Sequence, residues 1–247
     1  MALLEVQNVT KSFGGLNAVD NVSFSVERGE LIGLIGANGA GKTTLFSVIA
    51  GNLKPTSGDI RLDGQSIANL PPFRVSQLGI ARTFQIVRPF LAMTVEENVE
   101  IAALFGRAQQ GGVQARVEAA EIIKAVGLAS LKARRASELT LGAHKRLEVA
   151  RAIATQPHVL MLDEVMAGLT PTEVGEACEI IARLRRELNL TVLLVEHVMA
   201  AVMRLAERII VIHHGVKIAE GAPNEIIRDP RVVEAYVGAG FEHARPA

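Results

Sequence analysis

One eight-residue segment constrains this chain of 247 residues more than any other feature. The segment is rich in glycine and reads Gly36-Ala37-Asn38-Gly39-Ala40-Gly41-Lys42-Thr43. Residues 31–35 before it are apolar apart from one glycine, which is typical of a strand buried on both faces of a sheet. Residues 44–50 after it predict a helix that ends at Gly51. A strand, a loop of the pattern G-x-x-x-x-G-K-[ST] and a helix together predict a phosphate-binding loop.

The residue types in this loop suit a nucleotide phosphate. Glycine allows backbone N–H groups to curl around phosphate oxygens without clashes from Cβ atoms, and the following helix N-terminus adds partial positive charge. We expect Lys42 to reach the β- and γ-phosphates and the Thr43 hydroxyl to bind Mg²⁺. Because glycine makes up about 7% of residues in proteins, a chance match has a probability on the order of one per cent in a chain of this length.

An acidic pair, Asp163 and Glu164, follows the apolar residues 159–162, which predict a strand. The carboxyl ends of parallel strands form the edge of a sheet at which ligands bind. At that edge Asp163 would hold Mg²⁺, directly or through water, and Glu164 would polarise the attacking water. Two acids at a strand end are by themselves more often a solvated terminus. Next to a phosphate loop, we favour the catalytic interpretation.

Strands and helices alternate over most of the chain, which predicts an α/β protein with a mainly parallel sheet covered on both faces. The fold class we expect is a P-loop NTPase (RecA-like) core. The first 35 residues read as strands and predict an N-terminal antiparallel β subdomain. Residues of about 90–155 predict an inserted α-helical subdomain with a helix start at Thr94. The helical pattern is interrupted by glycines at 111–112, 127 and 142.

Residues 171–188 predict a helix, because apolar residues recur on one face. These are Val174, Ala177, Ile181, Leu184 and Leu188. Short apolar runs at 80–84, 191–195 and 208–212 predict further strands. We expect one domain over residues 1–247, with residues 239–247 as a loose tail.

Composition narrows the possible functions. The single cysteine, Cys178, excludes an intrachain disulfide, and we expect it at the edge of the core. Lys+Arg and Asp+Glu are equal at 26 each and aromatic residues make up 4%, which favours neither nucleic acid nor an anionic membrane as a partner. No apolar run reaches the roughly 18 residues of a spanning helix, and residues 1–13 lack a signal-peptide pattern. We therefore expect a cytoplasmic protein that serves a membrane only by docking on another chain.

The order of these features resembles that of the ATP-binding-cassette (ABC) ATPase family, over nearly the whole chain. The motifs that carry the resemblance are the phosphate loop, Gln85, residues 139–143 (Leu-Thr-Leu-Gly-Ala), Asp163-Glu164 and His197. Within the family, the chain is similar to the ATPases of high-affinity branched-chain amino-acid importers. The segments that carry this finer similarity are residues 81–85, 93–98, 167–169 and 220–238.

The resemblance implies a role for each matching residue. Phe13 would stack on the adenine of ATP, Gln85 would contact Mg²⁺ or the attacking water, and His197 would bridge the γ-phosphate and Glu164. Thr140 and Gly142 would contact the ATP that is held by the opposite subunit. The remaining ATP-binding residues would be those of the phosphate loop, namely Gly36, Ala37, Asn38, Gly39, Ala40, Gly41, Lys42, Thr43 and Thr44.

The resemblance also implies partners. These would be a second ABC ATPase subunit in a homo- or heterodimer, transmembrane permease subunits and, indirectly, an extracytoplasmic substrate-binding protein. The helical subdomain would carry the groove that receives the permease's coupling helix. The protein would lie on the cytoplasmic face of the inner membrane. It would power the import of branched-chain or other hydrophobic amino acids, or of related small acids and amides.

Three residues depart from the family pattern. Ala143 lacks the side-chain amide of the usual Gln, Val165 stands where Pro usually follows the catalytic Glu, and Thr170 replaces an Asp or Asn. The subunit's own half-site keeps its phosphate loop, its acid and its His, whereas the half-site that it completes for a neighbour would be slower. Such asymmetry would suit a heterodimer.

Two alternatives remain open at this level. One is a soluble ABC ATPase that serves cofactor assembly, translation or DNA repair, although the second cassette, long coiled coil or basic patch usual in such proteins is not visible in the sequence. The other is a weakly hydrolysing regulatory subunit, which the three departures motivate. Two charge clusters, Arg134-Arg135 and His144-Lys145-Arg146, we interpret as solvated helix faces.

Overall fold

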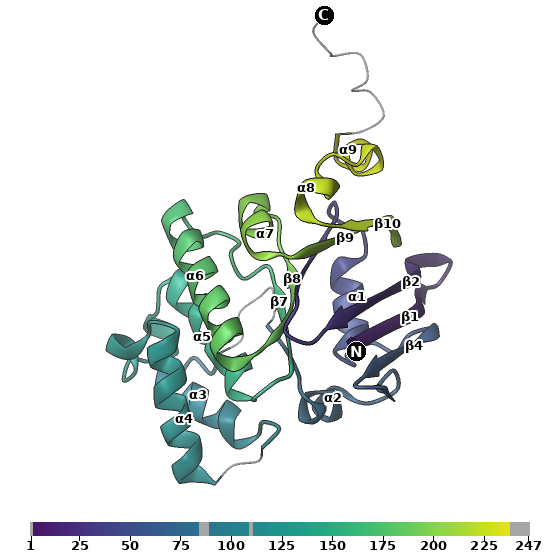
Figure 1. The fold of residues 1–247 in the computed structure, drawn as a ribbon. Helices are drawn as coiled ribbons and strands as arrows, with labels where there is room; N and C mark the ends of the chain where they lie inside the picture. Colours follow the sequence, from purple (N-terminus) through teal and green to yellow (C-terminus); the bar gives the residue numbers. More distant parts are fainter. Residues whose placement is uncertain (1, 84–88, 109–110, 238–247) are drawn as a thin grey trace, which may run out of the picture.

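The computed structural model describes residues 2–83, 89–108 and 111–237. Its central sheet has the strand order β10-β9-β3-β8-β7-β6. Figure 1 labels β7, β8, β9 and β10 of this sheet. The strands from β6 to β9 along this order pair in parallel, and β10 pairs antiparallel with β9. Their bounds are β3 Leu31–Ile35, β6 Ile80–Arg82, β7 Val159–Asp163, β8 Thr191–Val195, β9 Arg208–His213 and β10 Val216–Gly221.

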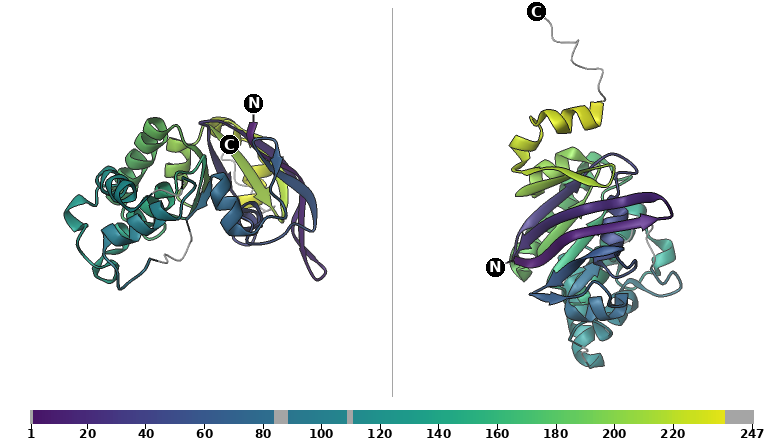
Figure 2. Two further views of the ribbon diagram at one scale, coloured as in Figure 1. Left: turned by 90° about the horizontal axis from the view of Figure 1, so that it is seen from below. Right: turned by 90° about the vertical axis from the view of Figure 1, so that its right-hand side faces the viewer.

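A second sheet is antiparallel and has the order β2-β1-β4-β5. Its strands are β1 Ala2–Phe13, β2 Leu16–Glu27, β4 Ser57–Leu62 and β5 Gln65–Ser66. Seen from the side in Figure 2, β1 and β2 lie in front of the central sheet. Helix α1 (Lys42–Ile49) contacts both β1 and β2. A buried apolar cluster joins α1 to the two sheets, and Phe46 and Ile49 of α1 are fully buried in it.

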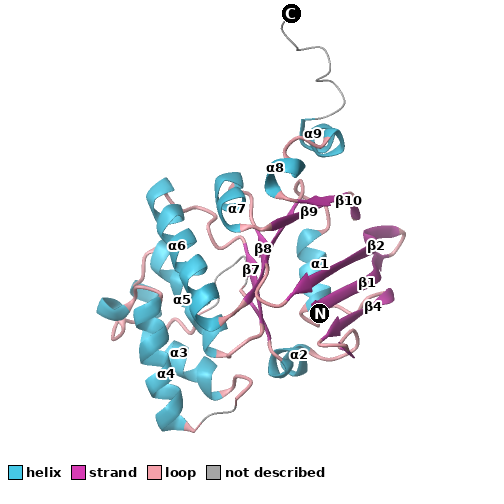
Figure 3. Ribbon diagram, viewed as in Figure 1, coloured by secondary structure: helices cyan, strands magenta, loops and turns pink. Residues whose placement is uncertain are grey.

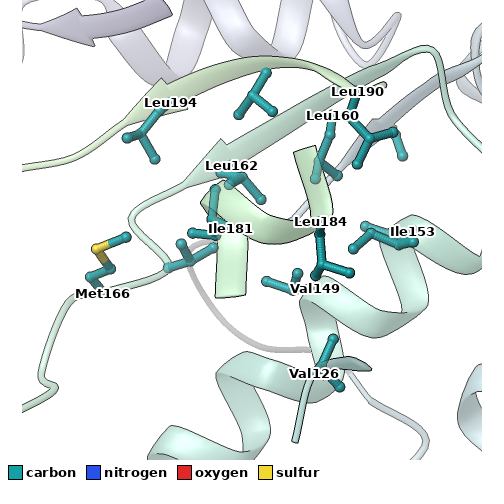
Figure 4. Close-up of a cluster of buried hydrophobic side chains, with 14 of the residues drawn as sticks. Val126, Val149, Ile153, Leu160, Leu162, Met166, Ile181, Leu184, Leu190 and Leu194 are labelled. Atoms are coloured by element: carbon teal, nitrogen blue, oxygen red, sulfur yellow. The ribbon is translucent and has the colours of Figure 1, made fainter. Parts of the chain in front are cut away.

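The alternation of side chains along β3 divides the core in two. Ile32 and Leu34 point into the cluster around α1, whereas Leu31 and Ile35 belong to a second cluster on the other face of the sheet. That second cluster brings together apolar side chains from β7, β8 and the helices packed on them (Figure 4). Both faces of the central sheet are therefore covered, as the apolar strands predicted.

Between β6 and β7 the described residues are mostly helical, and these helices stand together at one side of the molecule (Figure 3). They are α3 Val95–Leu104, α4 Gly112–Ala125 and α5 Leu141–Ala154, with short 3₁₀ turns at Ala129–Leu131 and Ala136–Glu138. Thr94 caps α3: its hydroxyl accepts from the Glu97 N–H, while the Glu97 carboxylate accepts from the Thr94 N–H. This reciprocal cap is the start that the sequence predicted.

The remaining helices lie before this group or after β7. They are α2 Pro72–Leu78, α6 Pro171–Leu188, α7 Met199–Leu205, α8 Pro223–Ile226 and α9 Pro230–Val237. Cys178 of α6 is 2% exposed, and its burial raises the pKa of the thiol. In the described ranges, none of the helices combines the length and the apolar character needed to cross a bilayer.

The α/β fold, the strand over residues 191–195 and the helix over residues 171–188 are confirmed. Two details of the prediction from the sequence were wrong. Leu188 is 49% exposed at the last position of α6, where the chain turns into left-handed Asn189, so it does not belong to the buried stripe. Gly142 does not interrupt a helix but lies in the first turn of α5, because Thr140 caps that helix one residue before it starts.

Candidate functional site

The glycine-rich loop connects β3 to α1, and two of its glycines are required by close contacts. A Cβ atom at Gly36 would stand 2.1 Å from the Ile212 carbonyl oxygen. A Cβ atom at Gly41 would stand 2.2 Å from the Ala18 carbonyl oxygen, and Gly41 has a φ of 105°. At Gly39, by contrast, no described residue lies within 4 Å of the Cβ position. The loop is therefore wedged against two backbone segments and open on one side.

Lys42 lies at the start of α1 and is 5% exposed. Its Nζ donates to the carbonyl oxygens of Gly36, at 2.7 Å, and Ala37, at 3.0 Å. Burial lowers the pKa of Lys42, and the negative charges of Glu164 and Asp163 oppose that shift. The ammonium group therefore lies on the loop and within electrostatic reach of the acidic pair from β7.

Asp163, the last residue of β7, is fully buried. Its Oδ2 accepts from Arg82 Nη2 at 2.7 Å, and Arg82 Nη1 donates to Ser47 Oγ in α1 at 2.9 Å. The other carboxylate oxygen, Oδ1, has no hydrogen-bond partner in the described part of the chain. An unpartnered, buried carboxylate oxygen beside a phosphate loop fits a hard divalent cation, whose preferred ligands are oxygens.

Glu164 follows directly and is 9% exposed, with a φ of 51°. Its N–H donates to the Val195 carbonyl oxygen at 2.9 Å, because β7 and β8 are neighbouring parallel strands. Its Oε1 lies 2.7 Å from Nε2 of His197, which follows β8. The two side chains thus meet where the carboxyl ends of adjacent parallel strands meet, at the edge of the sheet where ligands bind in such folds.

A cavity of about 620 Å³ joins the loop to these two side chains. Its volume is in the usual range for a small-molecule site. The lining residues are Ala18, Asn38, Gly39, Ala40, Gly41, Lys42, Thr43, Thr44, Glu164 and His197. The arrangement offers backbone N–H groups, a lysine and a hydroxyl on one side, and a carboxylate paired with an imidazole on the other. Such a set can bind a triphosphate and activate a water against it.

Other predicted site residues lie away from this cavity. Phe13, at the end of β1, is 48% exposed, and Lys11 Nζ lies 5.0 Å from its ring centroid. Thr140 and Gly142 lie at the N-terminus of α5, where the Thr140 hydroxyl accepts from the Ala143 N–H at 3.3 Å. Gln85 is outside the described residues.

Two of the departing residues have clear structural surroundings. Val165 is 3% exposed and packs in the cluster beneath α5 and α6. Thr170 caps α6: its hydroxyl accepts from the Glu173 N–H, and the Glu173 carboxylate accepts from the Thr170 N–H. Threonine therefore retains the capping ability of the Asp or Asn that it replaces.

Three charged residues of the site were missed by sequence reasoning or misread. The expectation that Lys145 lies on a solvated face is wrong, because it is 6% exposed and its Nζ donates to the Glu164 carbonyl oxygen at 3.0 Å. Glu196 is 2% exposed beside His197, and Arg82 pairs with Asp163. The sequence feature that could have identified Glu196 is its position at the end of an apolar strand, directly before a predicted site residue.

Comparison with known proteins identifies the family. Residues 19–167 match the family described as "ABC transporter". The chain belongs to the ABC transporter family. Residues 216–242 match a second family, described as "Branched-chain amino acid ATP-binding cassette transporter". Its membership in the ABC transporter family makes the chain an ATP-binding protein and an ATPase, and the predicted family and fold class are confirmed.

The chain is similar to relatives of nearly its own length. It is 41% identical to the high-affinity branched-chain amino acid transport ATP-binding protein BraF of Pseudomonas aeruginosa, over 96% of this chain and 98% of that one. It is 42% identical, over the same shares, to the corresponding protein LivG of Escherichia coli K12.

Two solved structures are similar in fold. A nucleotide-free ATP-binding cassette from an ABC transporter has a TM-score of 0.86 at 30% identity, covering 96% of this chain and 100% of that one. An ATP-binding cassette of an ABC transporter in its ADP conformation has the same TM-score at 32% identity, covering 96% and 99%.

Proposed function

We propose that this protein is the ATP-hydrolysing subunit of an importer for branched-chain or other hydrophobic amino acids, or for related small acids and amides. The observation that supports hydrolysis is the Glu164–His197 pair, which lines the same cavity as the phosphate loop. The substrate class is supported by the C-terminal match over residues 216–242 and by the names of the relatives.

In this proposal the phosphate loop binds the β- and γ-phosphates through its backbone N–H groups and Lys42. Mg²⁺ would be held by Thr43, Gln85 and Asp163, and when bound it neutralises phosphate charge. Glu164 accepts a proton from the attacking water, and His197 keeps the carboxylate oriented through the contact at its Oε1.

A second ABC ATPase subunit would complete each site. Thr140 is exposed at the N-terminus of α5 and outside the cavity, so it is available to a nucleotide held by another subunit, and the buried Gly142 would contribute only its backbone. The N-terminus of α5 carries partial positive charge, which favours contact with a γ-phosphate. Phe13, exposed at the end of β1, would stack on the adenine.

A transmembrane permease would dock beside the helices that follow β6. A groove of about 390 Å³ runs between β6, α3 and α5. Phe105 lines it and is 78% exposed, and Phe90 lines it and is 46% exposed. Exposed aromatic side chains at a groove are typical of interaction sites. The protein would then lie on the cytoplasmic face of the cell membrane, with an extracytoplasmic binding protein delivering the substrate to the permease.

Uptake measurements test the proposal. Deletion of this chain from its cell should abolish high-affinity uptake of labelled leucine, isoleucine or valine, and the parental chain should restore it. A K42A variant should not restore it, because its phosphate loop lacks the lysine. Labelled phenylalanine, urea and short amides test the wider substrate class. If uptake of all these compounds is unchanged by the deletion, the importer assignment is wrong.

A regulatory role is the second candidate, because Ala143 departs from the family pattern at the N-terminus of α5. Phosphate release from Mg-ATP, measured with and without the partner subunits, separates the two roles. An importer motor should hydrolyse ATP faster when its partners are present, whereas a regulatory subunit should bind ATP and leave the rate unchanged.

A further inference from the structure

Lys145 connects α5 to the backbone of the proposed catalytic acid. It is the fifth residue of α5 and is 6% exposed. Its Nζ donates to the Glu164 carbonyl oxygen at 3.0 Å. A buried ammonium group is retained only where its charge and N–H groups are satisfied, so this contact is a specific one.

Glu196 contacts the backbone of the same segment, two residues after Glu164. It follows β8 and is 2% exposed, and its Oε1 accepts from the Met166 N–H at 2.8 Å. Burial raises the pKa of Glu196, and the neighbouring backbone N–H groups together with the charge of Lys145 oppose the shift. The Glu196 carboxylate therefore fixes the backbone two residues after Glu164.

The backbone of Glu164 needs such support. Its φ of 51° is in the left-handed region, which residues with a Cβ atom adopt at a cost. Strained backbone of this kind persists at functional sites only where its surroundings over-determine it. Here the Glu164 N–H donates to the Val195 carbonyl, its own carbonyl accepts from Lys145, and Met166 is held by Glu196.

We propose that Lys145 and Glu196 are positioning residues, which hold residues 164–166 in the conformation that directs the Glu164 carboxylate toward the phosphate loop. This inference rests on the proposed role of Glu164 in hydrolysis. Because Lys145 belongs to α5, a displacement of α5 is passed to the Glu164 carbonyl. The helix whose N-terminus carries Thr140 and Gly142 is thereby linked to the acid of its own subunit.

The first test replaces Lys145 in the full-length protein. K145M keeps a side chain of similar length and removes the hydrogen-bond donor to the Glu164 carbonyl oxygen, whereas K145R keeps a donor at this position. A misplaced reacting group can lower a rate by on the order of 10²-fold. We expect kcat for Mg-ATP to fall about 10- to 100-fold in K145M with KM within about twofold, and K145R to recover most of the rate. K124M, on exposed Lys124 of α4, is the matched control and should keep the parental kcat.

The second test separates hydrogen bonding from charge at Glu196. E196Q keeps an oxygen that accepts from Met166, whereas E196L fills similar space without an acceptor. We expect E196Q to stay within about threefold of the parental kcat and E196L to lose about 10-fold or more. E121Q, on the exposed face of α4, is the control. E196L with the parental kcat, or E196Q as slow as E196L, would overturn the assignment.

A crystal structure of K145M tests the positioning role without an activity assay. In that structure, residue 164 should leave the left-handed region or lose its contact with His197. If Glu164 keeps both its backbone conformation and that contact, Lys145 is not a positioning residue. If the parental protein itself fails to hydrolyse ATP, the proposed function fails, whereas the crystal structure still decides whether Lys145 positions Glu164.

Discussion

The two segments that line the candidate nucleotide cavity are held in shape in different ways. The loop after β3, residues 36–43, is shaped by its own glycines and presents mainly backbone groups. The segment that begins with the last residue of β7, residues 163–170, presents side chains, and it is held in place by Lys145 from α5 and Glu196, which follows β8. The first loop is defined by a contiguous pattern, whereas the second depends on residues far away in the sequence.

Because of this difference, we expect variants of the two segments to alter different measured quantities, namely nucleotide affinity and turnover. Changes in the loop after β3 should act on nucleotide affinity or on folding, because that loop supplies N–H groups, Lys42 and close backbone contacts. Changes in the segment after β7 should act on turnover, because that segment carries the proposed base. A variant of the loop after β3 that alters only turnover, or a variant of the segment after β7 that alters only nucleotide affinity, would contradict this comparison.

The largest effect is expected for E164Q. Glutamine keeps the size of the side chain but cannot accept the proton of the attacking water, so kcat should fall about 10²- to 10⁴-fold. The Kd for ATP should stay within about twofold, since an acid of the second loop is not a phosphate ligand. Phosphate release and nucleotide titration measure the two quantities. Parental turnover in E164Q would show that Glu164 is not the base.

Substitution of glycine by alanine tests the first loop. In G41A the Cβ meets the Ala18 carbonyl at a residue with a φ of 105°, so the free energy of unfolding should drop by about 3 kcal/mol or more. At Gly39 none of the residues that the structure describes lies within 4 Å of the Cβ position, and G39A should lose only about 1 kcal/mol of that free energy. Urea denaturation monitors both variants. Equal losses would mean that the close contact at Gly41 is not what requires glycine.

Removal of the loop lysine should weaken binding. A hydrogen bond to a charged group contributes about 1.5–3 kcal/mol, so K42A should raise the Kd for ATP roughly 10- to 100-fold. A K42R variant keeps the charge and tests the fit of the ammonium group in the loop. An ATP titration of K42A that gives the parental Kd would exclude Lys42 as a phosphate ligand.

The smallest effect is expected at the end of the second segment. Thr170 caps α6, and T170A should lower the free energy of unfolding by about 1 kcal/mol while kcat changes little. T170N, which restores a capping side chain, should recover the stability. A large loss of turnover in T170A would instead give this residue a direct role in the site.

The sequence predicted the parts of the site that are local. The phosphate loop is one contiguous pattern, and Glu164 directly follows an apolar strand. The role of His197 came from the family resemblance, and the pairing of β7 with β8 places its side chain beside that of Glu164. The contact of Lys145 could not be predicted, because its burial depends on how α5 packs against residues 164–166. Three neighbouring charged residues on a helix are usually solvated, and only tertiary packing buries one of them.

In the fold, too, features set by neighbouring residues were predicted, whereas one feature of α5 was not. Helix α6 was predicted to its ends, because apolar residues recur on one face over residues 171–188, and the Thr170 cap and Pro171 fit its start. The glycine at position 142 was misread as an interruption, because it lies in the first turn of a helix that Thr140 caps and whose start was not predicted. A Cβ atom there would stand 2.7 Å from Glu173 Oε1 of α6.

The most direct test of the central claim is a structure of the E164Q protein with Mg-ATP. The account predicts that the terminal phosphates lie on the N–H groups of the phosphate loop, with Mg²⁺ near Thr43 and Asp163. The side chain of residue 164 should lie within hydrogen-bonding reach of a water in line with the γ-phosphate. A nucleotide bound elsewhere, or residue 164 turned away from the terminal phosphate, would contradict it.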